Sequence, residues 1–357
     1  ERKATGGFGV PDSTLTEVIS EFEKLPLHRV AASEGSAIAM GIGYWLRTHR
    51  PAHVYLQNSG LLSAGNPLLA LAHRNVYDIP LSMTVGWRGQ PSKGSAPTDE
   101  PQHLATGQMT QDFLHQCEFE VQVIESQEHY LEVLSQAVDG EAGRTALLVP
   151  RGILDRRIEQ LTSRTREGIF TNDAVLAIAK GFSGSHVFVS GTGYMSRDLA
   201  NSLELGSPRQ DKAFLLVGGM GYVAPVAAGI SLHPSGERLC AIEGDGGAMM
   251  NLGGIATLAD VRDASVDLFI LRNGVHASVG GQKVANANFN FEIFARACGF
   301  RNVVTVSTAR DLTDRLTWLR QNLSTEVTVT VVECQEPKIR TPSPRPSGLT
   351  NLARKFK

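Results

Sequence analysis

The chain has 357 residues, which exceeds the roughly 250 residues at which one hydrophobic core usually stops growing, so we expect two domains. Hydrophobic residues make up 42 % and charged residues 20 % of the sequence, a balance that excludes global disorder. The net charge of −2 comes without a basic stripe, which argues against nucleic acid as a partner.

The cysteines indicate the redox environment of the protein, and the apolar runs indicate whether it contacts a membrane. The four cysteines lie far apart and form no Cys-x-x-Cys pair, which argues against a zinc site or a disulfide framework and favours a reducing cytoplasm. No apolar run reaches the roughly 18 residues that a membrane span needs, so no membrane interaction is expected.

In the first half of the chain, short β-branched runs alternate with helical patterns, as in a parallel sheet with crossover helices. Strands are expected over residues 28–33, 53–57, 80–86, 120–124 and 145–149. Helices are expected over residues 14–24, 36–48, 67–73, 104–116 and 128–138.

The second half repeats this alternation after a charged connecting segment over residues 151–172. Strands are expected over residues 186–190, 213–217, 239–243, 266–271, 302–306 and 327–334. Helices are expected over residues 174–180, 196–205, 224–232, 248–259, 291–298 and 309–322. The sequence therefore predicts an α/β protein with two similar doubly wound parallel-sheet domains, residues 1–165 and 166–357, the second of which ends in a proline-rich tail.

Three strands of the second half are each followed by a glycine-rich loop that opens a helix. The loops are Gly191-Thr192-Gly193, Gly218-Gly219-Met220-Gly221 and Gly244-Asp245-Gly246-Gly247. Ligands of open parallel sheets bind outside the carboxyl ends of the strands, where glycine and the following helix N-terminus expose backbone N–H donors. A single loop of this kind is most often only a tight turn, but three on one sheet edge indicate an anion site that a diphosphate fits.

A further polar residue follows the next strand. Asn273 lies one helix and one strand after Gly246, so we expect it to be a neighbour of Asp245. A carboxylate, an amide oxygen and the backbone carbonyl near Val275 are hard oxygen donors of the kind that Mg²⁺ prefers.

This pair of motifs resembles the cofactor signature of thiamine-diphosphate enzymes. The resemblance implies that Asp245, Asn273 and Val275 hold the Mg²⁺ that anchors the diphosphate of the cofactor. It also implies that Met220 supports the bent cofactor conformation, and that the loops contribute Gly191, Thr192, Gly193, Gly219, Gly244, Gly246 and Gly247 to cofactor binding. Members of this family usually carry two consecutive asparagines, whereas Arg272 replaces the first of them here.

The same resemblance divides the chain into a pyrimidine-binding domain (residues 1–165) and a diphosphate-binding domain (residues 166–357). It implies a carboxylate in the first domain that faces the pyrimidine N1′ of the cofactor, and Glu34 is the candidate. Small and apolar neighbours would raise the pKa of Glu34, as suits a group that shares a proton. The alternative is an ordinary acidic residue in a first helical turn, where the helix dipole favours it.

Several stretches resemble phosphonopyruvate decarboxylases, with sulfopyruvate decarboxylases as near relatives. These stretches are Gly9-Val10-Pro11-Asp12-Ser13, Gln57-Asn58-Ser59-Gly60, Gly86-Trp87-Arg88-Gly89, Asp99-Glu100-Pro101-Gln102-His103, Val217-Gly218-Gly219-Met220-Gly221 and residues 273–282. The resemblance implies decarboxylation of phosphonopyruvate to phosphonoacetaldehyde and CO₂, within phosphonate and antibiotic biosynthesis.

A phosphonate beside an α-keto carboxylate carries several negative charges and needs arginine, amides and imidazoles around it. His103 and His276 are candidate catalytic residues, and a lid is expected in the long loop between Arg88 and His103. The candidate substrate-binding residues are Ser13, Asn58, Ser59, Arg88, Gln102, His103, His276 and Gln282. The alternatives are a surface cation for Arg88, capping roles for the histidines and a turn role for Asn58.

The family resemblance further implies self-association, at least a homodimer, with active sites at subunit interfaces. One rival function is sulfopyruvate decarboxylation. Another is a non-catalytic nucleotide-binding or regulatory α/β protein, which would have no reason to retain Glu34.

Overall fold

The computed structural model describes residues 6–91, 99–139, 143–154, 168–182, 184–203, 212–233, 236–261, 263–323, 325–336, 353–354 and 356. The chain divides into two compact units, Glu1–Glu159 with Val279–Ala285 and Gln160–Ser278 with Asn286–Lys357. The expected domain boundary at residues 165 and 166, most of the expected lid and most of the tail lie outside the described residues. Within the described ranges, no helix is both long enough and apolar enough to cross a membrane.

The first unit is built on a six-stranded parallel sheet with the strand order β2-β1-β3-β4-β6-β5. Its strands are β1 (Gly7–Gly9), β2 (His28–Val30), β3 (Ala52–Gln57), β4 (Leu81–Trp87), β5 (Glu120–Val123) and β6 (Thr145–Pro150). Its helices are α1 (Thr16–Phe22), α2 (Glu34–Thr48), α3 (Leu61–Pro67), α4 (Pro101–Gln116) and α5 (Gln127–Asp139), with short helical turns η1 (Ser13–Leu15), η2 (Asn58–Gly60) and η3 (Leu68–Ala72).

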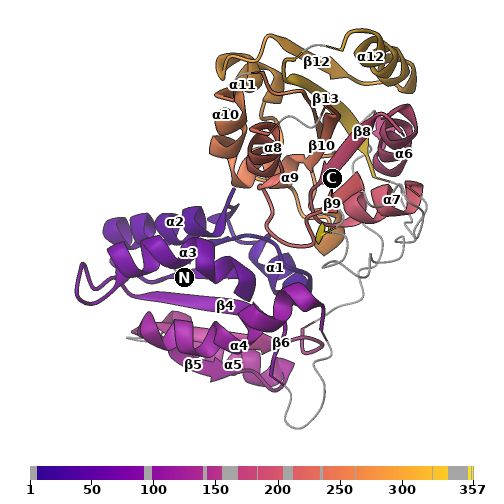
Figure 1. Ribbon diagram of the computed structural model, residues 1–357. Helices are drawn as coiled ribbons and strands as arrows, with labels where there is room; N and C mark the ends of the chain where they lie inside the picture. The colour runs from indigo at the N-terminus through magenta and orange to yellow at the C-terminus, as the bar shows by residue number, and fades with distance from the viewer. Residues whose placement is uncertain are drawn as a thin grey trace. The chain divides into compact units, whose positions relative to one another are not determined.

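The second unit contains another parallel sheet, with the order β12-β13-β11-β10-β8-β9 and β7 beside β13. Its strands are β7 (Ile169–Phe170), β8 (His186–Ser190), β9 (Ala213–Leu215), β10 (Arg238–Gly244), β11 (Val266–Arg272), β12 (Asn302–Val306) and β13 (Thr328–Gln335). Its helices are α6 (Thr171–Phe182), α7 (Tyr194–Ser202), α8 (Val223–Ser231), α9 (Asp245–Met250), α10 (Leu252–Ala259), α11 (Phe291–Ala297) and α12 (Ala309–Gln321), with the turn η5 (Ala277–Val279). Figure 1 shows the strands β8, β10 and β13 with the helices α6, α7, α8 and α10 around them.

Both faces of each sheet are buried under helices. Along β10, Cys240 and Ile242 join a core with α6, α7 and α12, whereas Leu239 and Ala241 join a core with α8, α10 and α11. In the first unit, consecutive residues of β6 likewise join two separate cores. Strands buried on both faces read as continuous apolar runs, which is why the sequence reveals them. The predicted pair of doubly wound parallel-sheet domains is confirmed.

Several elements differ from the expected ones. The helix expected over residues 67–73 begins earlier, as α3, and continues as η3, and β7 lies within the expected connecting segment. Strand β1 has the sequence Gly-Phe-Gly and contains no β-branched residue, so the pattern that reveals the other strands is absent there. The helix expected over residues 248–259 is two helices, α9 and α10, which meet at Asn251. The Asn251 side chain accepts a hydrogen bond from the N–H of Gly254 and so caps the second of them.

A buried carboxylate joins four strands of the second sheet near their amino ends. Asp267 on β11 accepts hydrogen bonds from Nε and Nη2 of Arg238 on β10 at 2.7 and 2.9 Å, and from the Thr328 hydroxyl on β13 at 2.7 Å. Nε2 of His186 on β8 lies 3.2 Å away. Burial alone would raise the pKa of Asp267, but these partners hold it below its ordinary value.

We expect Asp267→Ala to lower the free energy of unfolding by about 3–5 kcal/mol, because Arg238 would keep a buried charge without its partner. Since the pKa of Asp267 is lower in the folded chain, the stabilisation is present at neutral pH and lost as the pH falls through that lowered pKa. Urea unfolding at several pH values measures the effect. The exposed Asp314→Asn variant is the control, and equal stability of the two variants would contradict the assignment.

Candidate active site

The glycine loops of the second unit surround the point where the strand order reverses. β10 and β9 lie on opposite sides of β8, so the chain leaving β8 and the chain leaving β10 diverge at the carboxyl edge. Open α/β sheets bind ligands in this crevice. The Thr192 hydroxyl, after β8, donates to the carbonyl of Val217, after β9, at 3.0 Å and so joins two of the loops.

All predicted cofactor residues except Glu34 lie at this edge. The first loop contributes Gly191, Thr192 and Gly193, and the second contributes Gly219 and Met220, whose side chain is 40 % exposed. The third loop begins at Gly244, the last residue of β10, and continues through Asp245, Gly246 and Gly247 in the first turns of α9. Val275 and His276 follow β11 together with Asn273.

Asp245 connects the loop after β10 with the loop after β11. Its Oδ1 accepts a hydrogen bond from the N–H of Gly246 at 2.9 Å, and its Oδ2 accepts one from the N–H of Gly274 at 2.8 Å. The loop that contains Asn273 therefore lies beside Asp245, as the spacing in the sequence predicts.

The amide of Asn273 is oriented by its surroundings. Its Nδ2 donates to Glu336 at 2.7 Å, and the same carboxylate oxygen accepts from the Thr171 hydroxyl at 2.6 Å. Oδ1 of Asn273 accepts from the N–H of Val275 at 3.0 Å. Glu336 thus fixes which end of the amide is oxygen, a role that partners of metal ligands commonly have. Oxygen donors from Asp245, Asn273 and Val275 fit a hard divalent cation.

The unusual Arg272 leaves this arrangement intact. Its guanidinium is directed to Glu333 on β13 at 2.5 Å and to the carbonyl of Ala287 at 3.1 Å. His276 lies four residues after Arg272 in the sequence. Desolvation lowers the pKa of His276 to about 4, so its imidazole is neutral at pH 7. A neutral imidazole can both donate and accept a hydrogen bond.

In the first unit, Glu34 is the first residue of α2 and is 7 % exposed. Oε2 of Glu34 accepts a hydrogen bond from the Ser63 hydroxyl at 2.8 Å. A Cβ atom at position 60 would lie 2.6 Å from Oε1, so only glycine at Gly60 leaves room for the carboxyl. Burial raises the pKa of Glu34 despite the opposing hydrogen bonds from its own backbone N–H and from Ser63. The expected rise of the Glu34 pKa is present, but its role as a proton-sharing group stays a prediction, since Glu34 is also the acidic residue in the first turn of α2.

Ser13 and Ser59 belong to a polar group at the carboxyl edge of the first sheet. Its centre is the buried Asp12, which accepts hydrogen bonds from the Thr14 hydroxyl and from Nε2 of Gln57, the latter at 2.6 Å. The Ser59 hydroxyl donates to Oε1 of Gln57 at 2.8 Å. Burial raises the pKa of Asp12, although its hydrogen bonds and the nearby Arg88 act in the opposite direction.

Asn58 is occupied by intramolecular hydrogen bonds. Its Nδ2 donates to the carbonyl of Arg88 and to the Thr110 hydroxyl, both at 2.9 Å, and its Oδ1 accepts from the N–H of Arg88 at 3.1 Å. Asn58 therefore fixes the backbone at the end of β4 against α4, and its turn role has direct support. A contact between its amide and a substrate stays a prediction.

The guanidinium of Arg88 is buried and paired with two carboxylates. It donates to Oδ2 and Oδ1 of Asp99 at 2.8 and 2.6 Å, in a bidentate arrangement, and to Glu100 at 3.2 Å. Burial opposes the charge, but the carboxylates hold the pKa of Arg88 above its ordinary value. Gln102, in the first turn of α4, donates from Nε2 to the second oxygen of Glu100 at 2.7 Å. These contacts orient Arg88 and compensate its charge.

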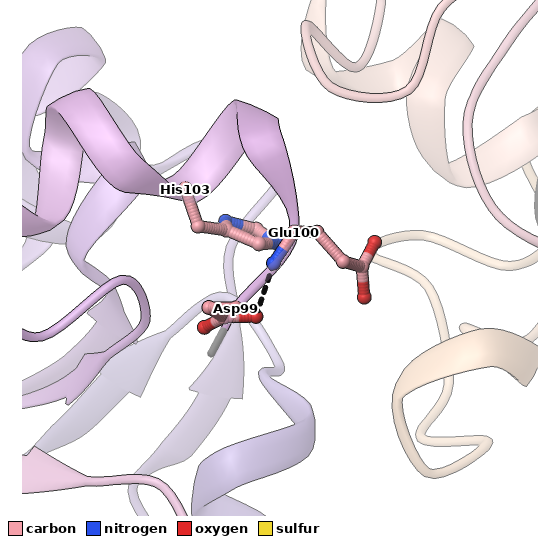
Figure 2. A group of neighbouring side chains, drawn as sticks. All are labelled: Asp99, Glu100 and His103. Atoms are coloured by element: carbon pink, nitrogen blue, oxygen red, sulfur yellow. Dashed lines mark hydrogen bonds between the residues drawn. The ribbon is translucent and has the colours of Figure 1, made fainter. Parts of the chain in front are cut away.

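Asp99, Glu100 and His103 form a small cluster whose potential ligand atoms lie within 4.8 Å of one another (Figure 2). The two oxygens of Asp99 already accept two hydrogen bonds from Arg88 and one each from the N–H groups of Gly89 and Glu100. The carboxylate of Glu100 is directed away from Asp99 in Figure 2. Because the lone pairs of Asp99 are already used, the cluster is a brace for Arg88 rather than a cation site.

The predicted site residues thus fall into two groups, one in each unit. Gln282, the remaining predicted substrate residue, lies in the segment Val279–Ala285 that is grouped with the first unit. Its Oε1 is buried and accepts no hydrogen bond within the part of the chain that the structure describes.

The geometry adds residues that the sequence analysis did not single out as site residues. Asp12 and Asp99 lie within stretches quoted for the family resemblance, and Glu243 directly precedes the Gly-Asp-Gly motif, so a closer inspection of those stretches could have found them. Glu243 is buried, which raises its pKa to about 7. Ser63 and Glu336 carry no such indication, because only the fold brings them to Glu34 and Asn273.

We expect Glu34→Gln to raise the midpoint of thermal unfolding at pH 7 by about 2 °C or more. The folded chain raises the pKa of Glu34, so the charged carboxylate destabilises the fold at neutral pH, and this cost disappears as the pH falls below the ordinary range of glutamate, about 4.3. Circular dichroism melts at pH 7 and pH 4 measure it, with Glu132→Gln on the exposed side of α5 as the control. A less stable Glu34→Gln variant at pH 7 would contradict the interpretation.

Comparison with known proteins identifies the family of both halves of the chain. Residues 3–118 match the family described as thiamine pyrophosphate enzyme, N-terminal TPP binding domain, and residues 191–334 match its C-terminal TPP binding domain. Proteins named phosphonopyruvate decarboxylase from Streptomyces hygroscopicus and Streptomyces viridochromogenes are 31 % and 30 % identical over 86 % of this chain and 79 % and 80 % of their own lengths. A sulfopyruvate decarboxylase from Methanosarcina acetivorans is 25 % identical over 82 % of this chain and 78 % of its own length. The chain therefore belongs to the phosphonopyruvate decarboxylase family of thiamine-diphosphate-dependent decarboxylases.

Proposed function

We propose that this decarboxylase converts 3-phosphonopyruvate to phosphonoacetaldehyde and CO₂, with thiamine diphosphate and Mg²⁺, in the biosynthesis of phosphonate natural products. The observation that carries this proposal is the similarity to two phosphonopyruvate decarboxylases over 86 % of the chain. The sulfopyruvate relative spans almost as much of the chain at a lower identity, which makes sulfopyruvate the second candidate substrate.

Bound thiamine diphosphate supplies a carbon nucleophile for the keto carbon and an electron sink for the bond to the departing CO₂. The glycine loops at the β8–β10 crevice would hold its diphosphate with backbone N–H groups. Asp245, Asn273 and the carbonyl of Val275 would hold the divalent cation, with Glu336 keeping the Asn273 amide in orientation.

Glu34 would hold the proton that the pyrimidine N1′ of the cofactor exchanges. Burial raises the pKa of its carboxyl, so the protonated form is easier to reach than at an exposed glutamate. Ser63 holds the carboxyl in place, and Gly60 allows its close approach to η2. These contacts preorganise the acid before any ligand is present.

The first unit would also bind the anionic end of the substrate. Arg88 is held rigidly by Asp99, so a phosphonate would compete with the longer contact to Glu100 rather than with the bidentate pair. Ser13, Ser59, Gln102 and the other predicted polar residues would add neutral hydrogen bonds. His103 and His276 are the candidates for moving protons on the substrate.

Protein stripped of cofactor should release CO₂ from phosphonopyruvate only when thiamine diphosphate and Mg²⁺ are both restored. Glu34→Gln should lower the rate by about 100-fold or more, because general acid–base catalysis typically contributes that much. A coupled assay for CO₂ measures both effects, with Glu132→Gln as the matched control.

The same assay separates the candidate substrates. Faster release from phosphonopyruvate than from sulfopyruvate or pyruvate is the expected result. A preference for sulfopyruvate would overturn the substrate proposal but leave the cofactor site intact. Full activity of Glu34→Gln would overturn the proposed role of the carboxyl.

We also propose that the chain self-associates at least as a homodimer, with active sites at subunit interfaces. Large apolar side chains of the first unit are exposed on α2, α3 and η3, elements that pack against one another. They include Leu46, Leu62 and Leu69, which are 60 %, 53 % and 44 % exposed. Exposed apolar side chains gathered on neighbouring elements are typical of protein–protein interfaces.

Sedimentation analysis at micromolar concentration should therefore detect a dimer or a larger assembly. Leu62→Glu should shift the protein toward monomer, because a charge in an apolar interface is costly. Leu323→Glu, at a leucine of the second unit that is 69 % exposed, is the control and should leave the assembly unchanged. A fully active monomer would refute the proposal.

A further inference from the structure

A buried carboxylate lies directly at the crevice between β8 and β10. Glu243 is the second-to-last residue of β10 and is 7 % exposed, yet no ion pair is formed by its side chain within the described residues. It stands two residues before Asp245, where the neighbouring strands are buried and apolar. A buried acid without a cationic partner destabilises the folded state, so stability does not explain the presence of Glu243.

Two of the glycine loops approach this carboxyl group closely. A Cβ atom at Gly191 would lie 2.2 Å from Oε1 of Glu243, and one at Gly247 would lie 2.5 Å from the same oxygen. Both loops can therefore pack on the carboxyl only because they carry glycine at these positions. The loop after β8 and the first turn of α9 thus share one contact, the carboxyl of Glu243.

The remaining glycine loop, which follows β9, reaches the same group through its backbone, because the N–H groups of Gly221 and Val223 act to lower the pKa of the Glu243 carboxyl. Oε1 of Glu243 also accepts a hydrogen bond at 3.1 Å from the N–H of Gly244, in the loop after β10. Helix α8 begins at Val223. The residue at its N-cap position, Tyr222, forms no side-chain hydrogen bond with the helix. The carboxyl of Glu243 therefore lies near backbone N–H groups at the amino end of α8.

One oxygen of the carboxyl group remains unused. Oε2 of Glu243 is buried and has no partner at hydrogen-bonding geometry in the described part of the chain. A group that served stability alone would be expected to have both oxygens satisfied, as Asp267 has in the same sheet. The carboxyl of Glu243 instead contacts the glycine loops while one of its oxygens lacks a hydrogen bond, which lowers the stability of the fold.

We propose that Glu243 is a positioning residue for the diphosphate half of the cofactor. Its carboxylate holds the loops at Gly191, Gly221 and Gly247 in the arrangement that receives the diphosphate, before the cofactor binds. This inference rests on the proposed cofactor site at the β8–β10 crevice and names a residue outside the predicted ligand set.

Two substitutions of similar size separate positioning from stability. Glu243→Gln keeps a carbonyl oxygen that can accept the loop N–H groups, whereas Glu243→Met has similar length but no such acceptor. Isothermal titration of the cofactor-free protein with thiamine diphosphate in the presence of Mg²⁺ measures affinity directly. We expect Glu243→Met to weaken binding by about tenfold or more, and Glu243→Gln to stay within about threefold of the unchanged protein.

Thermal unfolding of the cofactor-free variants is the second readout. We expect Glu243→Met to unfold at the same temperature as the unchanged protein or higher, because it removes an incompletely satisfied buried acid. Glu237→Met, at the other end of β10, is the control and should not change affinity.

Equal affinity of Glu243→Met and the unchanged protein would overturn the inference. So would a loss of affinity that follows a loss of thermal stability and is not rescued in Glu243→Gln. If the unchanged protein itself failed to bind thiamine diphosphate with Mg²⁺, the proposed cofactor site would fail first, which distinguishes that failure from an error about Glu243.

Discussion

The arrangement of the second unit depends on the hydrogen bonds and the ion pair that compensate the buried charge of Asp267. Four adjacent strands contribute to this network, through His186, Arg238, Thr328 and Asp267 itself. Because a slip of one strand would leave a buried charge unpaired, the network fixes the register of the strands at their amino ends. The carboxyl ends, and the glycine loops that follow them, are thereby aligned at the opposite edge, where the cofactor site is proposed.

The carboxyl groups of this protein differ mainly in how completely they are satisfied. Asp267 and Asp99 each accept several charge-assisted hydrogen bonds and hold structure together. Among the described residues, Glu34 has a single side-chain donor and Oε2 of Glu243 has no hydrogen-bond partner, although both glutamates are buried. Burial without full compensation raises the pKa of both glutamates. The protein thus accepts a cost in stability at two acids of its proposed cofactor sites, as functional sites commonly do.

Periodicity in the sequence predicts most of the fold because the strands are buried on both faces. It fails at β1, where Gly-Phe-Gly has no strand character of its own, and at Asn251, where a side-chain cap divides one helical pattern into two. Of the site, the loop spacing correctly places Asp245 beside the loop of Asn273. The pairing of Arg88 with Asp99 and the support of Asn273 by Glu336 depend on tertiary contacts, which no local pattern encodes.

The close approach of Gly60 to Glu34 has a consequence for how the sequence can change over time. Any side chain at position 60 would occupy the space of the carboxyl group, so a mutation there removes the acid from its place even though Glu34 itself is unchanged. Positions 34 and 60 therefore form an epistatic pair. A descendant that had lost the acid could accept a larger residue at position 60, and the return of the carboxyl to its place would then require two reversions rather than one.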